Sequence, residues 1–134
     1  LNSEFKNDNI EFLCGDFTKL NLKNSFDYVY SRFTIHSIPE DGEDRLLNWS
    51  FCNLHTGGGI FIEARSIRDD LYSEGTKISK TENFTDHYRR YVNKDILIKK
   101  LKKIGFYIIY EIESKGLAVY KDEDPYIVRI VGKK

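Results

Sequence analysis

The feature that most constrains the fold is a strand–helix–strand pattern in the first half of the chain. Phe26 to Phe33 (FDYVYSRF) combines aromatic and β-branched residues and predicts a strand. Pro39 begins a predicted helix with several carboxylates in its first turns, where they favour the positive end of the helix dipole. Gly57 to Gly59 ends this unit, and Ile60 to Ala64 (IFIEA) predicts the next strand. Helical spacing predicts that the buried face of the helix consists of Leu47, Phe51 and Leu54.

The rest of the chain continues this alternation of strands and helices. Asn9 to Cys14 (NIEFLC) predicts a buried strand, and Asn93 and Gly105 match the N-cap and the end of a second helix. Ser66 to Tyr91 lacks clean periodicity and is interpreted as a long functional loop with at most a short helix. One α/β domain over residues 1–134, with an open and mostly parallel sheet, is therefore predicted. Its closing strands are predicted at Phe106–Glu113, Leu117–Tyr120 and Tyr126–Val131.

Composition narrows the classes of function. Lys and Arg number 21, as do Asp and Glu, so no general electrostatic drive toward nucleic acid or an anionic membrane is expected. No apolar run approaches the ~20 residues of a membrane span, and no signal-peptide pattern opens the chain. Cys14 and Cys52 lie in apolar segments without metal-ligand spacing; we interpret them as reduced core residues of a cytoplasmic protein and predict no metal site. The chain has no Met and begins at Leu1, which predicts a trimmed or partial polypeptide.

Three segments, taken in order, carry a resemblance to a known family. They are Cys14–Phe17 (CGDF), Phe26–Ser31 (FDYVYS) and Leu54–Glu63 (LHTGGGIFIE). They resemble the turn after the third strand, the fourth strand and the helix-to-strand turn of class I S-adenosylmethionine-dependent methyltransferases. The resemblance covers roughly Ile10 to Val131 and implies a Rossmann-like sheet of order 3-2-1-4-5-7-6, mostly parallel with a reversed C-terminal strand pair. It also implies S-adenosyl-L-methionine as cofactor and a small-molecule acceptor. Asp86–Arg90 and Asp124–Pro125 further resemble small bacterial methyltransferases linked to tellurite resistance or polysaccharide modification.

The chain departs from this family at its beginning. The glycine-rich turn that follows the family's first strand has no counterpart, and Gly57–Gly59 cannot replace it because it precedes a strand. The N-terminal strands of the family are therefore predicted to be missing. A complete cofactor site is not expected from these residues alone, and a homo-oligomer or strand-swapped dimer could complete the sheet.

The resemblance assigns cofactor-binding roles to four residues. Asp16 and Phe17 would lie at the adenine, and Ser31 and Arg32 would lie near the sulfonium. The alternatives are a turn-forming aspartate for Asp16 and an ordinary core aromatic for Phe17. Ligands in open α/β sheets bind beyond the carboxyl ends of the strands, which is where Ser31 and the charged Arg32 fall.

Five further residues are predicted on the acceptor side. Arginine side chains bind carboxylate or phosphate oxygens, so the cluster around residues 87–91 favours an anionic acceptor. A general base is needed only when the acceptor must lose a proton, and the two histidines of the set are the catalytic candidates for it. An exposed charged loop and a structural ion pair between Glu63 and Arg65 are the alternatives. The predicted residues are His36 and His87 as catalytic, and Arg65, Tyr88 and Arg89 as substrate-binding.

The predicted function is thus methyl transfer from S-adenosylmethionine to a small acceptor, with an anionic one favoured. The rival from another class is a non-catalytic methyltransferase-like subunit that binds a partner through its open sheet edge. A third alternative, a small ligand-binding domain of unrelated chemistry, would have no affinity for adenosyl compounds.

Overall fold

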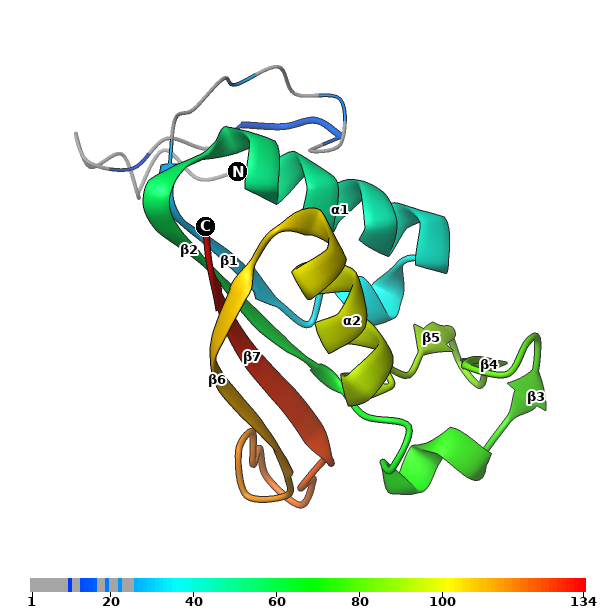
Figure 1. Cartoon of the computed structure of the whole chain (residues 1–134). Helices are drawn as coiled ribbons and strands as arrows, with labels where there is room; N and C mark the ends of the chain where they lie inside the picture. Colours follow the sequence, from blue (N-terminus) through cyan, green and yellow to red (C-terminus); the bar gives the residue numbers. More distant parts are fainter. Residues whose placement is uncertain (1–9, 11–12, 17–18, 20–21, 23–25) are drawn as a thin grey trace.

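The computed structural model describes residue 10, residues 13–16, residues 19 and 22, and residues 26–134. Of the predicted buried strand Asn9–Cys14, residues 9, 11 and 12 lie outside the described residues. Ile10, Leu13 and Cys14 are exposed and lie in no strand, so the prediction is wrong for these three residues. Within the described residues, a four-stranded sheet is covered by two helices, and a smaller sheet lies at one end (Figure 1). The elements are β1 (Phe26–Arg32), η3 (Ile35–Ser37), α1 (Glu40–Asn53), β2 (Leu54–Arg65), η4 (Asp70–Ser73), β3 (Thr76–Lys77), β4 (Glu82–Phe84), β5 (Tyr88–Arg90), α2 (Lys94–Ile104), β6 (Tyr107–Ser114) and β7 (Ile127–Lys133).

The larger sheet has the order β1-β2-β7-β6. β1 pairs with β2 in parallel, and β7 pairs antiparallel with both β2 and β6. Three strands therefore run in one direction, and β7 alone in this sheet is reversed. The predicted order 4-5-7-6 for this end of the sheet is confirmed, whereas the predicted reversal of a strand pair is wrong for β6.

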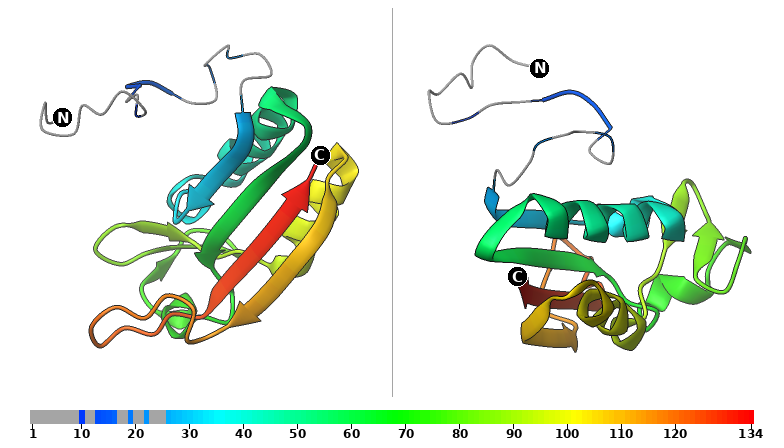
Figure 2. Two further views of the ribbon diagram at one scale, coloured as in Figure 1. Left: turned by 90° about the vertical axis from the view of Figure 1, so that its left-hand side faces the viewer. Right: turned by 45° about the horizontal axis from the view of Figure 1, so that its top comes forward.

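Both helices pack on one face of the sheet (Figure 2). Leu47 of α1 and Leu101 of α2 are completely buried against Ile60, Val128 and Ile130 of the strands. Removal of each such side chain from water contributes roughly 1.5–3 kcal/mol, so this single layer of contacts supplies most of the stabilisation. On the opposite face of the sheet, Tyr28, Tyr30 and Tyr107 are exposed.

The helix α1 and the strand β2 follow each other directly. Pro39 is the N-cap of α1, where the helix was predicted to begin. Leu54 is buried as predicted, but it belongs to β2, so its predicted place in the helix is wrong. Leu47 is buried and Phe51 packs at the edge of the core. The glycine run lies inside β2, where a Cβ on Gly58 would come within 2.7 Å of the Asp27 carbonyl oxygen. Only glycine permits this close approach of β1 to β2.

Two other predictions differ from the structure. The predicted loop Ser66–Tyr91 contains η4 and the antiparallel sheet β3-β4-β5. Its strands have two or three residues each, too short for a periodic apolar pattern to arise in the sequence. Leu117–Tyr120 is a turn region rather than a strand, with an isolated bridge between Tyr120 and Glu123.

The two cysteines are free and exposed, so their predicted place in the core is wrong. Cys52 falls on the outer side of α1, because the inward positions of this helix are taken by Leu46, Leu47, Ser50 and Asn53. In the described part of the chain, the helices are too short or too polar to cross a bilayer.

Candidate functional site

A cavity of about 230 Å³ lies at the carboxyl ends of β1 and β2. Its lining comes from three separate parts of the chain: the segment after β1, the last residue of β2, and the β4–β5 hairpin. Four of the five lining residues were predicted from the sequence. The lining residues are Phe33, His36, Arg65, His87 and Arg89.

Phe33 is the lining residue that the sequence did not single out. It leaves β1 with a backbone φ of 55°, a left-handed conformation that is rare for a bulky side chain. Its N–H donates to the Glu63 carbonyl oxygen over 2.8 Å, which fixes this turn against β2. The Phe33 ring centroid lies 5.2 Å from the His36 ring centroid. The positive φ therefore places an aromatic wall beside the histidine, and nothing in the local sequence signals it.

His36 lies in η3, directly beyond the end of β1. Burial lowers the pKa of His36 from 6.5 to about 4, and its electrostatic interactions with Arg65, Arg89, His87 and Arg90 lower it further. Its Nδ1 atom is buried and has no hydrogen-bond partner among the described residues. The imidazole is therefore uncharged at neutral pH, in surroundings whose electrostatic potential is positive.

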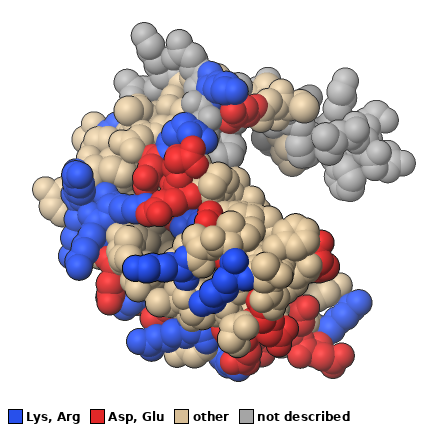
Figure 3. Space-filling model, turned by 90° about the vertical axis from the view of Figure 1, so that its right-hand side faces the viewer, with Lys and Arg blue, Asp and Glu red and all other residues tan. Residues whose placement is uncertain are grey.

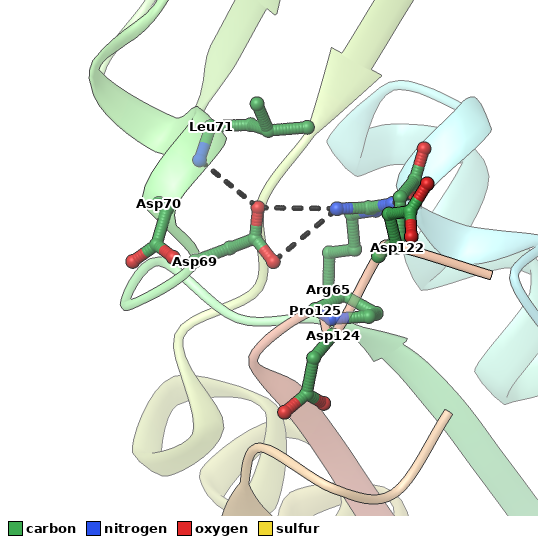
Figure 4. Close-up of a pocket in the computed structure, with 8 residues that line it drawn as sticks. Arg65, Asp69, Asp70, Leu71, Asp122, Asp124 and Pro125 are labelled. Carbon is green, nitrogen blue, oxygen red and sulfur yellow. Dashed lines mark hydrogen bonds and ion pairs between the residues drawn. The ribbon is translucent and has the colours of Figure 1, made fainter. Parts of the chain in front are cut away.

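Arg65 ends β2 and already has two carboxylate partners. Its Nη1 atom donates to both Asp69 carboxylate oxygens at 3.2 and 3.3 Å (Figure 4). Its Nη2 atom donates to Glu123 Oε2 at 2.9 Å. The predicted alternative of an ion pair between Arg65 and Glu63 is therefore wrong. Glu63 instead pairs with Arg32 of β1 and with Arg129 of β7.

The β4–β5 hairpin supplies the other two polar residues of the cavity. Arg89 Nη1 donates to Thr85 Oγ1 at 2.6 Å and lies 3.3 Å from Asp86 Oδ1. His87 Nδ1 lies 2.9 Å from the same Asp86 oxygen, and its side chain is 56% exposed. Hydrogen bonds from Thr85, its own backbone and His87 hold the pKa of Asp86 at about 2, well below its usual value. Asp86 is thus ionised and orients both His87 and Arg89.

Arg90 attaches this hairpin to the body of the domain. Its buried guanidinium donates to the carbonyl oxygens of Ile35 and Ile38 at 3.0 Å each and to the Glu43 carboxylate of α1. The next residues pair with the end of β2, where Val92 N–H donates to the Arg65 carbonyl oxygen over 2.8 Å. These contacts place the hairpin over the end of the larger sheet, where a substrate-binding segment was expected.

Tyr88 is not among the residues that line this cavity. Its hydroxyl donates to Glu82 Oε1 at 2.6 Å within the small sheet. Burial and this hydrogen bond raise the pKa of Tyr88 above its usual range. Its contacts are therefore those of a structural residue of the hairpin.

Three of the four predicted cofactor residues lie within the described part of the chain, two of them at the end of β1. Ser31 is buried, and its Oγ atom has no hydrogen-bond partner among the described residues. Arg32 lies on the opposite face of β1, with its Nε atom 2.9 Å from Glu63 Oε1 and its guanidinium over the Phe33 ring. Asp16 is half-exposed, with Lys19 Nζ 3.2 Å from its Oδ2 atom. Phe17 lies outside the described residues.

A second cavity of about 230 Å³ is also lined by Arg65 (Figure 4). Its lining is strongly acidic, with Asp69, Asp70, Asp122 and Asp124 among the residues. Even so, in the described part of the chain no three His, Cys, Asp or Glu side chains are arranged to hold a metal ion. On the face that carries the small sheet, cationic and anionic side chains are interspersed (Figure 3).

Comparisons with known proteins support the fold that was predicted from the sequence. Residues 1–62 match the profile of a family described as a methyltransferase domain. A S-adenosylmethionine-dependent methyltransferase from Methanosarcina mazei superposes with a TM-score of 0.78 at 15% identity, over 92% of this chain and 66% of that one. The chain has a class I methyltransferase fold. The predicted resemblance and fold class are thereby confirmed.

Other structures with the methyltransferase fold extend the comparison. The 1,6-didemethyltoxoflavin-N1-methyltransferase of Burkholderia thailandensis, solved with its substrate and S-adenosylhomocysteine, gives a TM-score of 0.64 at 14% identity, over 88% of this chain and 48% of that one. A complex that contains the Trm112 methyltransferase activator of Haloferax volcanii gives 0.69 at 14% identity, over 97% and 64%. The chain thus spans about two thirds or less of the length of these structures. The search of curated proteins found no match.

Proposed function

We propose that this chain belongs to an enzyme that transfers a methyl group from S-adenosylmethionine to a small anionic acceptor. The observation that carries the proposal is the cavity at the carboxyl ends of β1 and β2, which joins His36, Arg65, His87 and Arg89 within a methyltransferase fold. Methyl transfer from a sulfonium is an in-line displacement, so the protein mainly has to orient the acceptor. Guanidinium groups bind carboxylate or phosphate oxygens, and Arg89 on the cavity wall is the arginine best placed to bind those of the acceptor.

The residues on the cofactor side support the same proposal. S-Adenosylmethionine supplies an electrophilic methyl group when it is bound. The buried Ser31 hydroxyl at the end of β1 has no partner among the described residues, and a bound cofactor would satisfy it. Asp16, a half-exposed carboxylate, would receive the adenine amino group, and Arg32, the last residue of β1, would lie near the sulfonium.

The proposal is tested by product analysis. The protein is incubated with S-adenosylmethionine and a set of single-ring hydroxy acids, and mass spectrometry follows S-adenosylhomocysteine and the methylated acid. We expect turnover that falls at least tenfold in Arg89→Gln, which removes one charged donor from the cavity. The matched control is Arg45→Gln, which removes an exposed arginine of α1 that is paired with Asp41. Equal turnover in the two variants would contradict the anionic acceptor.

One observation favours a second candidate, a non-catalytic subunit. Four tyrosines on the open sheet face, Tyr28, Tyr30, Tyr107 and Tyr110, are between 48% and 76% exposed. Each tyrosine offers roughly 150–250 Å² of surface, and a stable interface needs about 800 Å² per partner. This face would then bind a partner protein or a second copy of the chain. Light scattering at increasing protein concentration tests self-association, and a concentration-independent monomer that releases S-adenosylhomocysteine would exclude the second candidate.

A further inference from the structure

The proposed function does not explain why an uncharged imidazole lies among arginines. His36 forms part of the cavity wall, and the charged groups that act on it come from two other elements: Arg65 at the end of β2, and His87, Arg89 and Arg90 from the β4–β5 hairpin. A purely anion-binding cavity would gain from another cation at this position. His36 is instead kept neutral and packed against the Phe33 ring.

A neutral imidazole and a guanidinium recognise different chemical groups. Guanidinium N–H groups only donate hydrogen bonds, and an ionised carboxylate or phosphate only accepts them. A neutral imidazole has one nitrogen that accepts, and an anion cannot fill it because it has no proton to donate. The partner of that nitrogen must therefore be an O–H or N–H group.

We infer that the cavity selects an acceptor that carries both an anionic group and a hydroxyl or N–H group, with the anion on Arg89 and the hydroxyl or N–H donating to His36. This inference rests on the proposed function and names its substrate class. The cavity volume of about 230 Å³ is large enough for an acceptor with a single substituted ring.

Of the lining residues, Arg89 is best suited to bind the anionic group, and His36 is best suited to accept from the hydroxyl or N–H group. Arg65 is already neutralised by Asp69 and Glu123, whereas Arg89 shares its one described carboxylate, Asp86, with His87. His87 is more than half exposed, and its Nδ1 atom is engaged by Asp86. His36 has neither restriction.

The same contact has a consequence for the reaction. As the acceptor oxygen or nitrogen bonds to the methyl carbon, the carbon–sulfur bond breaks and its electron pair stays on sulfur. The proton of the acceptor then passes to His36 and from there to solvent. Because the surrounding cations disfavour a protonated His36, the anionic group of the acceptor offsets their charge.

Binding of matched benzoates tests this inference without any need for turnover. Calorimetry compares 3-hydroxybenzoate with 3-methoxybenzoate, which has the same anion but no proton to donate, and the 4-substituted pair covers the other spacing. We expect the wild-type chain to prefer the hydroxylated member of at least one pair by about three- to tenfold, the value of one hydrogen bond. Phenol, which lacks the anion, should bind at least tenfold more weakly.

Variants assign the preference to His36. His36→Phe keeps an aromatic ring beside Phe33 and should bind both members of the pair equally, whereas His36→Asn, which retains an acceptor, should recover part of the preference. Arg89→Gln should weaken both members together and leave their ratio unchanged. The matched control is His55→Phe, which alters an exposed histidine at the opposite end of β2. Thermal unfolding checks that each variant is folded.

The outcomes separate this inference from the proposed function. An unchanged preference in His36→Phe, or a wild-type chain that binds none of the benzoates, would overturn the inference. If S-adenosylhomocysteine binds and the hydroxyl preference is absent, the substrate class is wrong while the proposed function stands. If the preference depends on His36 and S-adenosylhomocysteine does not bind, the cavity recognises such acids and the methyl-transfer reaction is wrong.

Discussion

The arginines near the cavity differ in how completely their charge is neutralised. Arg90 and Glu43 are about 5% and 3% exposed in their side chains and form a buried pair that also contacts Lys100. Arg89 lies on the cavity wall, where a ligand can compete for it. In the sequence, Arg89 and Arg90 are adjacent, and nothing there indicates which of them is buried. Only the alternation of sides along β5 separates the structural residue from the candidate binding residue.

Arg90→Gln should therefore lower the free energy of unfolding by about 3 kcal/mol, because it leaves Glu43 buried with part of its compensation removed. Urea denaturation measures this loss. The exposed pair of Arg45 and Asp41 provides the control, and Arg45→Gln should cost less than about 1 kcal/mol. A similar cost for the two variants would mean that the hairpin is not held by Arg90.

The depressed pKa of His36, about 4 against 6.5, makes stability depend on pH. The unfolded chain binds this proton more tightly than the folded chain does, so the folded state loses stability as the pH falls from about 6.5 to 4. Because the ring is partly exposed, we expect a loss on the order of 2 kcal/mol. Urea denaturation across this pH range should show that His36→Phe removes this component. If the free energy of unfolding depends on pH in the same way in wild type and His36→Phe, a group other than His36 is responsible.

At the scale of elements, the sequence predicted the ends of helix α2, because the cap residues at those ends determine them locally. The helix α2 begins where Asn93 Oδ1 accepts a hydrogen bond from the Ile96 N–H at 3.1 Å, and it ends at Gly105 with a φ of 122°. Both were predicted because the cap residues satisfy backbone groups that no other residue type satisfies as well. The strands β3 to β5 were missed because tertiary contacts hold them: Asn83 donates to the carbonyl oxygens of Tyr72 and Glu74.

Gly105→Ala tests the end of α2. A Cβ at this position would lie 2.8 Å from Phe51 Cζ, so the substitution adds a steric conflict to the unfavourable backbone conformation. We expect thermal unfolding to show a loss of about 2–3 kcal/mol. Gly116 is the matched control, because its φ is also positive at 77° and no atom lies within 4 Å of an added Cβ. Gly116→Ala should cost about 1 kcal/mol, and an equal cost at both sites would contradict the packing of Phe51 on Gly105.

At the scale of the whole molecule, the order of the strands determines where the candidate site lies. The end of the sheet predicted from the family resemblance is present as β1-β2-β7-β6, and it aligns the carboxyl ends of β1 and β2 at one edge. His36, Arg65, His87 and Arg89 were predicted because charged residues at strand ends are informative, and the structure brings them to one cavity. Phe33 could not be predicted, because its role depends on a positive φ. Tyr88 was predicted from its neighbours in sequence, and in the structure its hydroxyl contacts Glu82.

Calorimetric titration of the chain with S-adenosylhomocysteine is the most direct test of the account, because methyl transfer requires a site for this product. Because one chain is not expected to form a complete cofactor site, we predict saturable micromolar binding at protein concentrations at which copies of the chain associate. This binding should be weakened at least tenfold in Asp16→Ala, which removes the carboxylate expected at the adenine. The control is Lys19→Ala, which removes a lysine that pairs with Asp16 but is not expected to contact the adenine. Absence of binding by a chain that still unfolds cooperatively would contradict the account and would leave the partner-binding subunit as the better explanation.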